Sequence, residues 1–207
     1  MIEVAVDTKT KILDSAEKLF GNKGFDATSL RDITAEADVN LAAVNYHFQT
    51  KESLIDAVIA RRLEPVNRRR LEMLAAAGPN ATVEQLVEAF VLPAVQQDVS
   101  SILPMMGRAF ASPDPFLLRI FKRNLIPIAD RFCEAFMVAL PQLSPEECRW
   151  RLLFAAGSMA QTLSWSQLVG EITRGVCDAT DREAVTDRLV RFVAAGFRAS
   201  DVREGHA

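Results

Sequence analysis

Residues 28–51 leave little freedom in how this chain can fold, because they encode two short helices joined by almost no connection. Ser29 is a favourable N-cap, and Asp32 stands three residues later, where an acidic side chain completes a capping box. The sequence therefore predicts a helix over residues 30–37. Its small buried face is expected to consist of Leu30, Ile33 and Ala37.

A second short helix is predicted directly after the first. Asp38 and Val39 make the turn, and Asn40 can cap the helix that follows. Apolar residues recur at helical spacing and are expected to form its buried side: Leu41, Val44 and Phe48. The outward or flanking positions then carry Ala42, Ala43, Asn45, Tyr46 and His47. Two short helices with a tight turn between them are typical of a helix-turn-helix unit.

The outward residues of the second helix have the chemistry needed to contact duplex DNA. Small residues let a helix backbone lie close to base edges, and Asn45 can pair with the adenine edge. Hydrogen-bond donors for phosphates are available at Tyr46, His47 and Lys51. Because a plain solvent-facing helix would more usually carry Glu and Lys here, this side of the helix is predicted to bind DNA.

A third helix is predicted upstream of these two. Five apolar residues fall on one helical face, and Gly24 follows where a helix end is expected: Ile12, Leu13, Ala16, Leu19 and Phe20. The layout helix, Gly-Phe-x-x-Thr-Ser, helix, turn, Asn-Tyr-His-Phe and a following Lys strongly resembles the N-terminal domain of the TetR family of transcriptional regulators. The resemblance is detailed over about residues 8–60 and extends to the whole chain in length and helical organisation.

The resemblance implies a role for each matching residue. Phosphate contacts are expected from Ser29, Tyr46, His47 and Lys51. Base edges are expected near Arg31, Leu41, Ala42 and Asn45. Leu41 and Ala42 cannot hydrogen-bond bases, so direct readout should come mainly from Arg31 and Asn45. The predicted DNA-binding set is Ser29, Arg31, Asn40, Leu41, Ala42, Ala43, Asn45, Tyr46, His47 and Lys51.

Within that family, the stretch Val-Asn-Leu-Ala-Ala-Val-Asn-Tyr-His-Phe is similar to PsrA-type regulators. These repress fatty-acid degradation genes and release DNA on binding long-chain fatty acids. Because the similarity lies in the DNA-reading helix, it implies a related operator more directly than a related effector.

The length and charge of the chain limit its organisation. A chain of 207 residues with 49% hydrophobic content fits a small helix-turn-helix domain, residues 1–50, and a larger effector-binding and dimerisation domain, residues 51–207. The net charge of −3 predicts modest non-specific affinity for DNA and a shallow salt dependence. No apolar run is long enough to span a bilayer and no signal peptide is recognisable, so a cytoplasmic protein is expected.

The remainder of the chain is predicted to be all-α, giving about nine helices in total. One helix starts at Lys51 and is expected to kink or end at Pro65. The others are predicted over residues 83–99, 100–111, 116–140, 145–169 and 180–199, with Ser144 capping the fourth and Thr180 with Glu183 opening the fifth. Two interpretations are open for a basic stretch in and after this helix: a solvated face that pairs with Glu64 and Glu72, or a long-range attraction for DNA. The stretch consists of Arg61, Arg62, Arg68, Arg69 and Arg70. Three thiols are expected to be buried and reduced: Cys133, Cys148 and Cys177.

Small residues on the last two predicted helices allow close approach of another helix: Ala155, Ala156, Gly157, Ala194, Ala195 and Gly196. Two such helices can form a four-helix interface with a second copy, as the family resemblance also implies. A twofold homodimer predicts a pseudo-palindromic operator.

An apolar effector site is predicted between residues 105 and 165, although the same residues could simply be core. The candidate lining is Met105, Met106, Arg108, Phe110, Phe121, Leu125, Phe132, Gln161 and Trp165. A fatty acid or acyl-CoA is the expected effector, with its head group near Arg108 or Gln161. The alternative is a regulator of efflux or detoxification genes that responds to another hydrophobic small molecule.

The sequence does not favour an enzyme. It has no phosphate-binding Gly-rich loop, no nucleophile elbow and no metal-spaced His or Cys set, so no catalytic residue, metal or cofactor is expected. The histidines are His47, within the helix-turn-helix, and His206, near the C-terminus. A helical structural dimer without DNA binding is the more distant alternative.

Overall fold

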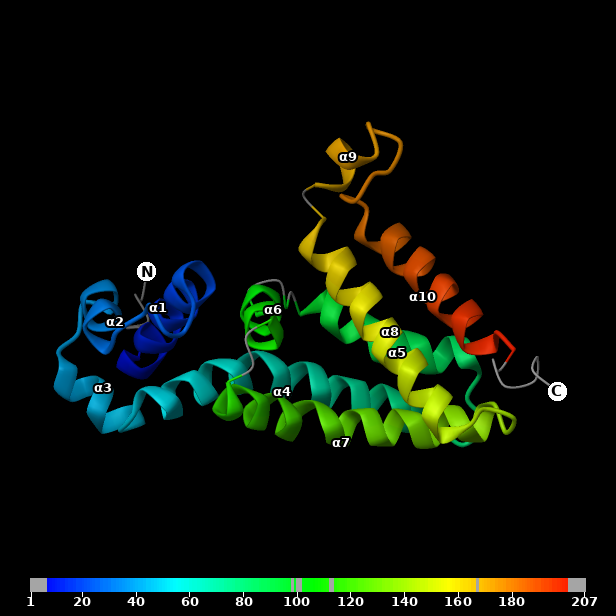
Figure 1. The fold of residues 1–207 in the computed structure, drawn as a ribbon, viewed down its shortest axis with the longest axis horizontal. Coiled ribbons are helices and arrows are strands. Elements are labelled where there is room, and N and C mark those ends of the chain that lie inside the picture. Colours follow the sequence, from blue (N-terminus) through cyan, green and yellow to red (C-terminus); the bar gives the residue numbers. More distant parts are fainter. Residues whose placement is uncertain (1–6, 98, 100–101, 112–113, 167, 201–207) are drawn as a thin grey trace, which may run out of the picture. The chain divides into compact units, whose positions relative to one another are not determined.

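The computed structural model describes residues 7–97, 99, 102–111, 114–166 and 168–200, with the backbone alone for residues 108–111. Within these ranges the chain forms ten α-helices and no strand (Figure 1), so the prediction of an all-α fold is confirmed. The chain divides into two compact units. The first comprises residues 1–64 and 100–121, and the second residues 65–99 and 122–207.

The first unit contains the helices predicted from the N-terminal motif. It consists of α1 (Thr8–Lys23), α2 (Leu30–Ala37), α3 (Leu41–Phe48), the start of α4 (Lys51–Ala77), α6 (Leu103–Ala111) and the start of α7 (Pro115–Ala139). These segments are amphipathic, and each packs its apolar face into a common core. The most buried core residues are Ile12, Ala16, Phe20, Ile33, Val44, Leu54, Val58, Ile59, Ile102 and Met105.

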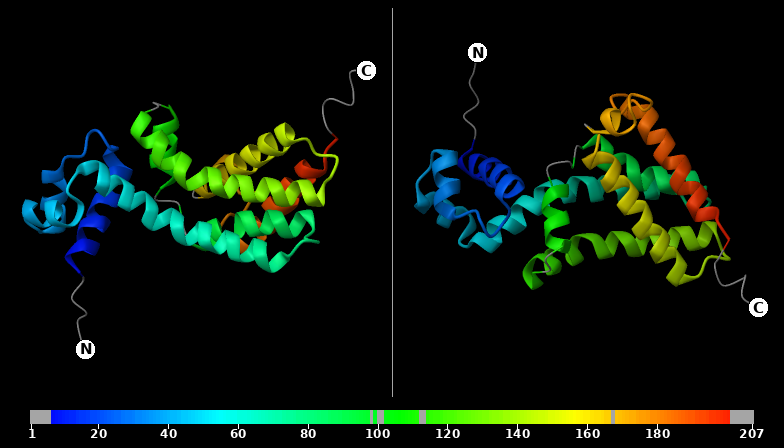
Figure 2. Two further views of the ribbon diagram at one scale, coloured as in Figure 1. Left: turned by 90° about the horizontal axis from the view of Figure 1, so that it is seen from below. Right: turned by 45° about the horizontal axis from the view of Figure 1, so that its top comes forward.

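The second unit is a bundle made from the rest of α4 and α7 with α5 (Val83–Gln96), α8 (Pro145–Ser164), α9 (Val169–Ile172) and α10 (Arg182–Arg198). Helix α10 packs against both α5 and α8 (Figure 2). Aromatic pairs fill its core: the rings of Phe136 and Phe197 stack at 3.8 Å, and those of Phe90 and Phe132 meet edge to face at 5.3 Å. Such ring pairs stabilise a core beyond the area they bury.

Helix α4 does not end at Pro65, since it runs through the proline as one helix of 27 residues. A proline inside a helix removes one main-chain hydrogen bond, and burial of neighbouring apolar side chains can offset that loss. Leu63 and Val66, on either side of the proline, are both buried. In addition, the Gln97 side chain donates to the Pro65 carbonyl at 3.3 Å.

Several helix ends differ from the prediction. Helix α5 ends at Gln96 rather than 99, α6 begins at Leu103 rather than 100, and α8 ends at Ser164 rather than 169. The predicted cap of α10 at Thr180 is also wrong. Asp181 caps the helix instead, because its Oδ1 accepts from the Ala184 N–H at 3.0 Å, and the Thr180 hydroxyl donates to Asp178. The cap at Ser144 is confirmed, because its Oγ accepts from the Glu147 N–H at 3.2 Å, and Thr82 caps α5 in the same way with a 3.3 Å bond from the Gln85 N–H.

The thiols divide into two kinds. Cys133 and Cys148 are buried and free, as expected, but Cys177 is exposed, so that part of the prediction is wrong. Cys177 lies in the connection between α9 and α10. In the described residues, no helix is both long and apolar enough to cross a bilayer.

Candidate nucleic-acid interface

The start of α2 is fixed by a reciprocal capping box. The Asp32 N–H donates to Ser29 Oγ at 3.1 Å, and the Ser29 N–H donates to Asp32 Oδ2 at 2.8 Å. The hydrogen bonds from the Ser29 main chain and hydroxyl lower the pKa of Asp32. The predicted capping box is therefore confirmed, and it leaves the N-terminal turn of α2 at the surface.

Thr28 joins this turn to the end of α1. Its side chain is fully buried, and its hydroxyl donates to the Gly24 carbonyl at 2.8 Å. Gly24 has a φ of 86°, a left-handed conformation that glycine adopts without strain, and its N–H bonds the Phe20 carbonyl at 2.9 Å. The Gly-Phe-x-x-Thr-Ser motif thus sets the direction in which α2 leaves α1.

The turn between α2 and α3 has the geometry that the sequence predicted. Asp38 closes α2 in the left-handed region, at φ 52° and ψ 52°, a conformation that aspartate tolerates better than most residues. Asn40 then caps α3, because its Oδ1 accepts from the Ala43 N–H at 2.8 Å. The helix-turn-helix is thereby held by local hydrogen bonds on both sides of its turn.

Helix α3 buries one side and presents the other. Val44 and Phe48 are buried as predicted, and Tyr46 is 83% exposed. The Tyr46 and His47 rings meet edge to face at 5.1 Å. Leu41 was expected on the buried side and is 43% exposed, so that prediction is wrong. Leu41 is the first helical residue, and a helical side chain leans towards a preceding turn that this helix lacks.

The other members of the predicted DNA-binding set lie at or near the surface of the same unit. Ser29, Arg31, Asn40, Ala42 and Asn45 are exposed. Ala43, His47 and Lys51 are half-buried. These residues are therefore accessible for contact, and they include the N-caps of both short helices, Ser29 and Asn40. Partial charges at helix amino ends attract phosphates even in a domain that is not basic overall.

Thr50 was missed by the sequence analysis and positions Lys51. Its hydroxyl oxygen accepts from the Ser53 N–H at 3.0 Å, which caps α4, and Gln49 precedes it at a φ of 62°. The signal was present as a Thr-x-x-Ser pattern directly before an apolar helical face. This cap begins α4 immediately beyond the end of α3.

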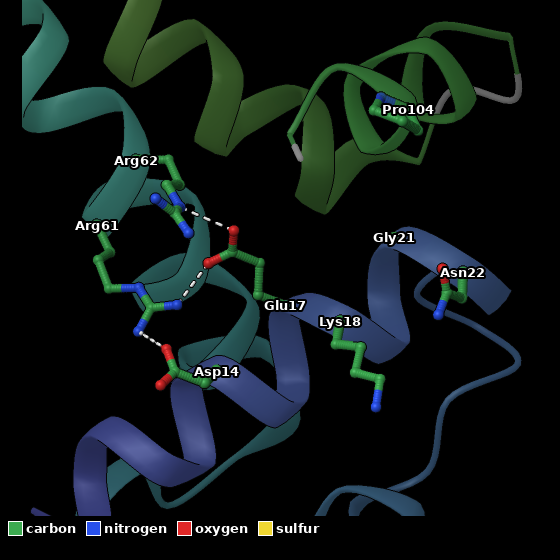
Figure 3. Close-up of a pocket in the computed structure, with 8 residues that line it drawn as sticks. All are labelled: Asp14, Glu17, Lys18, Gly21, Asn22, Arg61, Arg62 and Pro104. Carbon is green, nitrogen blue, oxygen red and sulfur yellow. Dashed lines mark hydrogen bonds and ion pairs between the residues drawn. The ribbon is translucent and has the colours of Figure 1, made fainter. Parts of the chain in front are cut away.

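A cluster of ion pairs links α1 to α4 within the first unit (Figure 3). Glu17 is buried and accepts from Arg61 at 2.5 Å and from Arg62 at 2.7 Å, while Arg61 also bonds Asp14 at 2.7 Å. The expected pairing of this basic stretch with Glu64 is thus replaced by pairing with α1. A cavity of about 390 Å³ beside the cluster is lined by Asp14, Glu17, Lys18, Gly21, Asn22, Arg61, Arg62 and Pro104.

Farther along α4, the arginines of the basic stretch differ in burial. Arg69 pairs with Glu72 at 3.3 Å, as predicted for a solvated face. Arg70, assigned to the same face, is buried, and that assignment is wrong. The helical turn that exposes Arg69 directs Arg70 towards α5, where it lies over the Phe90 ring.

The predicted effector-site residues are divided between the two units. In the first unit Met105 and Phe121 are buried and Met106 is half-buried. In the second, Phe132 is buried, Leu125 is half-buried, and Gln161 and Trp165 are exposed. The side chains of Arg108 and Phe110, and the whole of His206, lie outside the described residues. In the described part of the chain, no group of three or more His, Cys, Asp or Glu side chains could hold a metal ion.

Helices α8 and α10 carry an exposed apolar face, which we call the α8–α10 face. Its large members are Trp150, Leu153, Phe154 and Phe192. The rings of Trp150 and Phe154 stack at 5.7 Å. Gly157 and Gly196 are exposed on the same helices, where nothing lies within 4 Å of an added Cβ atom. Large apolar groups gathered beside small residues are typical of a surface that packs against another helix.

Comparison with known families agrees with this architecture. A family model described as "Bacterial regulatory proteins, tetR family" matches residues 12–58, which contain α2 and α3. A second, described as "Tetracyclin repressor-like, C-terminal domain", matches residues 88–196, more than half of the chain. This chain belongs to the TetR family. TetR-family proteins are transcriptional regulators and not enzymes.

Individual relatives support the assignment over part of the chain. The probable HTH-type regulator YttP of Bacillus subtilis is 36% identical over 40% of this chain and 40% of its own length. The HTH-type repressor KstR2 of Rhodococcus jostii is 34% identical over 38% and 39%. The match thus spans about two fifths of each relative.

Solved structures extend the likeness to nearly the whole chain. The fatty acid degradation regulator FadR of Bacillus halodurans has a TM-score of 0.67 at 13% identity, covering 93% of this chain and 97% of that one. A transcriptional regulator of Aquifex aeolicus has a TM-score of 0.63 at 18% identity, covering 91% and 99%. At these identities the likeness shows that the TetR-family fold is shared.

Proposed function

We propose that this TetR-family protein is a DNA-binding transcriptional regulator that binds a pseudo-palindromic operator as a homodimer. The observation that carries the proposal is the outward side of α3, where Tyr46 is 83% exposed beside Asn45 and the small residue Ala42. An exposed aromatic at this place gains nothing for folding, whereas its hydroxyl can donate to a phosphate. Residues 1–50 form the DNA-binding domain in this proposal, and residues 51–207 form the effector and dimer domain.

The two capped helix ends support the proposed mode of binding. Ser29 and Asn40 each satisfy one main-chain N–H at their helix start, so others in the first turn stay available for phosphate oxygens. With α3 in the major groove, Arg31 and Asn45 read base edges, and Tyr46, His47 and Lys51 bind the backbone.

A homodimer through the α8–α10 face supplies the second DNA-reading helix. Isologous packing pairs the same face of both copies, which buries Trp150, Phe154 and Phe192. Twofold symmetry then requires an operator whose two half-sites are related by the same symmetry.

The regulator is a repressor that an apolar effector releases from DNA. Support comes from the PsrA-like DNA-reading helix and from the fold shared with a fatty acid degradation regulator. Within the second unit, the candidate lining comprises Leu125, Phe132, Gln161 and Trp165. Helix α4 contributes residues to both units and is the element through which a ligand changes DNA affinity. A coupling of about 1–3 kcal/mol is enough to shift operator occupancy.

The test is a binding titration on DNA from upstream of the protein's own gene, with and without fatty acids and their coenzyme A esters. Specific binding to that DNA, weakened by one of these compounds, is the expected result. Binding no tighter than to unrelated DNA would overturn the regulator proposal and favour a structural dimer. Specific binding that only other hydrophobic molecules weaken would overturn the fatty-acid effector and favour control of efflux or detoxification genes.

A further inference from the structure

Arg70 brings a positive charge into the core of the second unit. Its side chain extends from α4 between α5 and α8, and the residue is only 5% exposed. Nε donates to the Phe90 carbonyl at 2.8 Å, and the guanidinium carbon lies 4.4 Å from the centre of the Phe90 ring. One terminal nitrogen bonds Asn67 Oδ1 at 3.2 Å, and the other lies 3.6 Å from the Met159 sulfur.

No carboxylate among the described residues pairs with this guanidinium. A guanidinium has five N–H groups, and the three contacts above account for one each. Burial lowers the pKa of Arg70 to about 10, so the group still carries its charge at neutral pH. An uncompensated charge in a protein interior is costly, and an anion placed against it recovers much of that cost.

Arg151 shows how the same unit satisfies an arginine that serves structure alone. It is also buried, but its Nε bonds Glu147 at 2.9 Å. Its terminal nitrogen donates to the carbonyls of Phe197 and Ala199 at 2.7 and 2.8 Å, which closes the end of α10. Arg151 therefore has a counter-charge and strong oxygen acceptors, and Arg70 has neither a counter-charge nor more than one short bond.

The Phe90 carbonyl does not by itself explain an arginine at position 70. A carbonyl oxygen has two lone pairs, so the Phe90 carbonyl can accept Arg70 Nε in addition to a main-chain N–H. A neutral donor such as glutamine could bond one carbonyl without carrying a charge into the core.

The surroundings of Arg70 are apolar and adaptable. The Phe90 ring packs edge to face with Phe132, and Met159 is a flexible side chain whose sulfur is a weak acceptor. A ligand oxygen can replace that sulfur without loss of a strong bond. Two oxygens of one carboxylate match two parallel N–H groups of a guanidinium.

We propose that Arg70 binds the carboxylate of an apolar organic acid in the core of the second unit, with the hydrocarbon part against Phe90, Phe132 and Met159. The inference rests on the proposed function, since it specifies the head group of the proposed apolar effector. It selects a free acid over a thioester, because a thioester brings no negative charge to that site. It also moves the head group from Gln161, which is exposed, to a buried cation.

The experiment measures binding of three probes of equal chain length to the full chain by calorimetry at neutral pH: decanoate, 1-decanol and decylamine. A charge-assisted pair to a buried group predicts that decanoate binds at least about tenfold more tightly than 1-decanol. Arg70→Met removes this preference. Arg69→Met is the matched control, because Arg69 is exposed and paired with Glu72, and it keeps the preference.

If Arg70→Met does not fold, Arg70→Lys serves in its place. It keeps the charge and loses the paired N–H groups, so decanoate affinity falls about tenfold while 1-decanol affinity is unchanged. Equal affinity of the wild-type protein for decanoate and 1-decanol overturns the inference. So does failure of decanoate to bind, or a preference for decanoate that survives in Arg70→Met.

Parallel titrations with operator DNA separate this inference from the proposed function. Arg70-dependent binding of decanoate with no change in DNA affinity supports the acid site and overturns its role as an effector site. Release of DNA by decanoate and 1-decanol at equal concentrations supports apolar control and overturns the acid site.

Discussion

Arg62 Nε lies 2.7 Å from Oε1 of Glu17, and the other oxygen of that carboxylate accepts from Arg61. The buried carboxylate of α1 is thus held by two consecutive guanidinium groups of α4. Because α1 carries the helix-turn-helix through Thr28 and Gly24, this pairing fixes the angle at which α4 meets the proposed DNA-binding surface.

Glu17→Gln is expected to lower the free energy of unfolding by about 1–3 kcal/mol, because it leaves two guanidinium groups without their shared counter-charge. Chemical denaturation followed by circular dichroism measures the change. The control is Glu36→Gln, which removes an exposed pair with Lys18 and should cost no more than about 1 kcal/mol. Equal losses in the two variants would show that burial of the Glu17 pair contributes nothing.

A second ion pair predicts a pH dependence in the other unit. Both oxygens of Glu84 are bonded by Arg198, and these hydrogen bonds lower the pKa of Glu84. A folded-state pKa below the unfolded value of about 4.3 means that the pair stabilises the protein above that pH. Its contribution is lost as the pH falls through the folded-state pKa.

Glu84→Gln should therefore lower the free energy of unfolding by about 0.2–1 kcal/mol at neutral pH, with the difference from wild type shrinking below about pH 4. Urea titrations at several pH values measure it. Glu88→Gln makes the same chemical change at an exposed residue of the same helix and should leave the free energy of unfolding nearly unchanged at neutral pH. A Glu84→Gln difference that stays constant down to about pH 3 would contradict the assigned direction of the pKa shift.

The Tyr46 hydroxyl gives a test of the proposed phosphate contacts. Tyr46→Phe keeps the ring and removes one donor, so DNA affinity should fall about three- to tenfold, by the same factor on operator and unrelated DNA. Fluorescence anisotropy with labelled duplexes measures both. Gln142→Ala, an exposed change after α7, should leave both affinities as they are. A loss confined to the operator would mean that Tyr46 reads bases.

Asn45→Ala should act on sequence preference. Loss of an asparagine–adenine pair costs about 1–3 kcal/mol on the operator, while unrelated DNA, which offers no matching adenine edge, is bound as before. The ratio of the two affinities therefore falls about tenfold or more. If both affinities fall together, Asn45 contacts the backbone and direct readout must come from Arg31.

Local hydrogen bonds explain why so much of the helix-turn-helix could be predicted. Ser29 and Asn40 find their partners three residues along the chain, so the sequence alone contains both members of each pair. The prediction that Thr180 caps α10 was wrong for a related reason. Thr180 and Asp181 are adjacent candidates, and the choice depends on Asp178, which occupies the Thr180 hydroxyl at 2.7 Å.

Long-range packing explains what could not be predicted. Arg70 follows Arg69 in an apparently solvated stretch, yet its partners Phe90 and Met159 stand 20 and 89 residues away. Nothing near Arg70 in the sequence indicates that α5 and α8 cover it. The continuity of α4 through Pro65 depends on packing in the same way. These outcomes follow from which helices meet, and a periodic pattern does not specify that.

The α8–α10 face predicts which substitution breaks the proposed dimer. Phe154 is 62% exposed on this face, where its ring stacks with that of Trp150, whereas Val138 is 65% exposed on α7, outside it. Aromatic residues at the centre of an interface often contribute 2 kcal/mol or more, and a carboxylate there is buried without a partner. Phe154→Glu should therefore raise the dimer dissociation constant about 100-fold or more, as measured by sedimentation over a range of protein concentrations. Val138→Glu introduces the same carboxylate at a similarly exposed position and should leave the dimer intact. If Val138→Glu weakens the dimer and Phe154→Glu does not, the interface lies on α7. The half-sites would then have to match a different separation of the two DNA-reading helices, because the symmetry axis sets that separation.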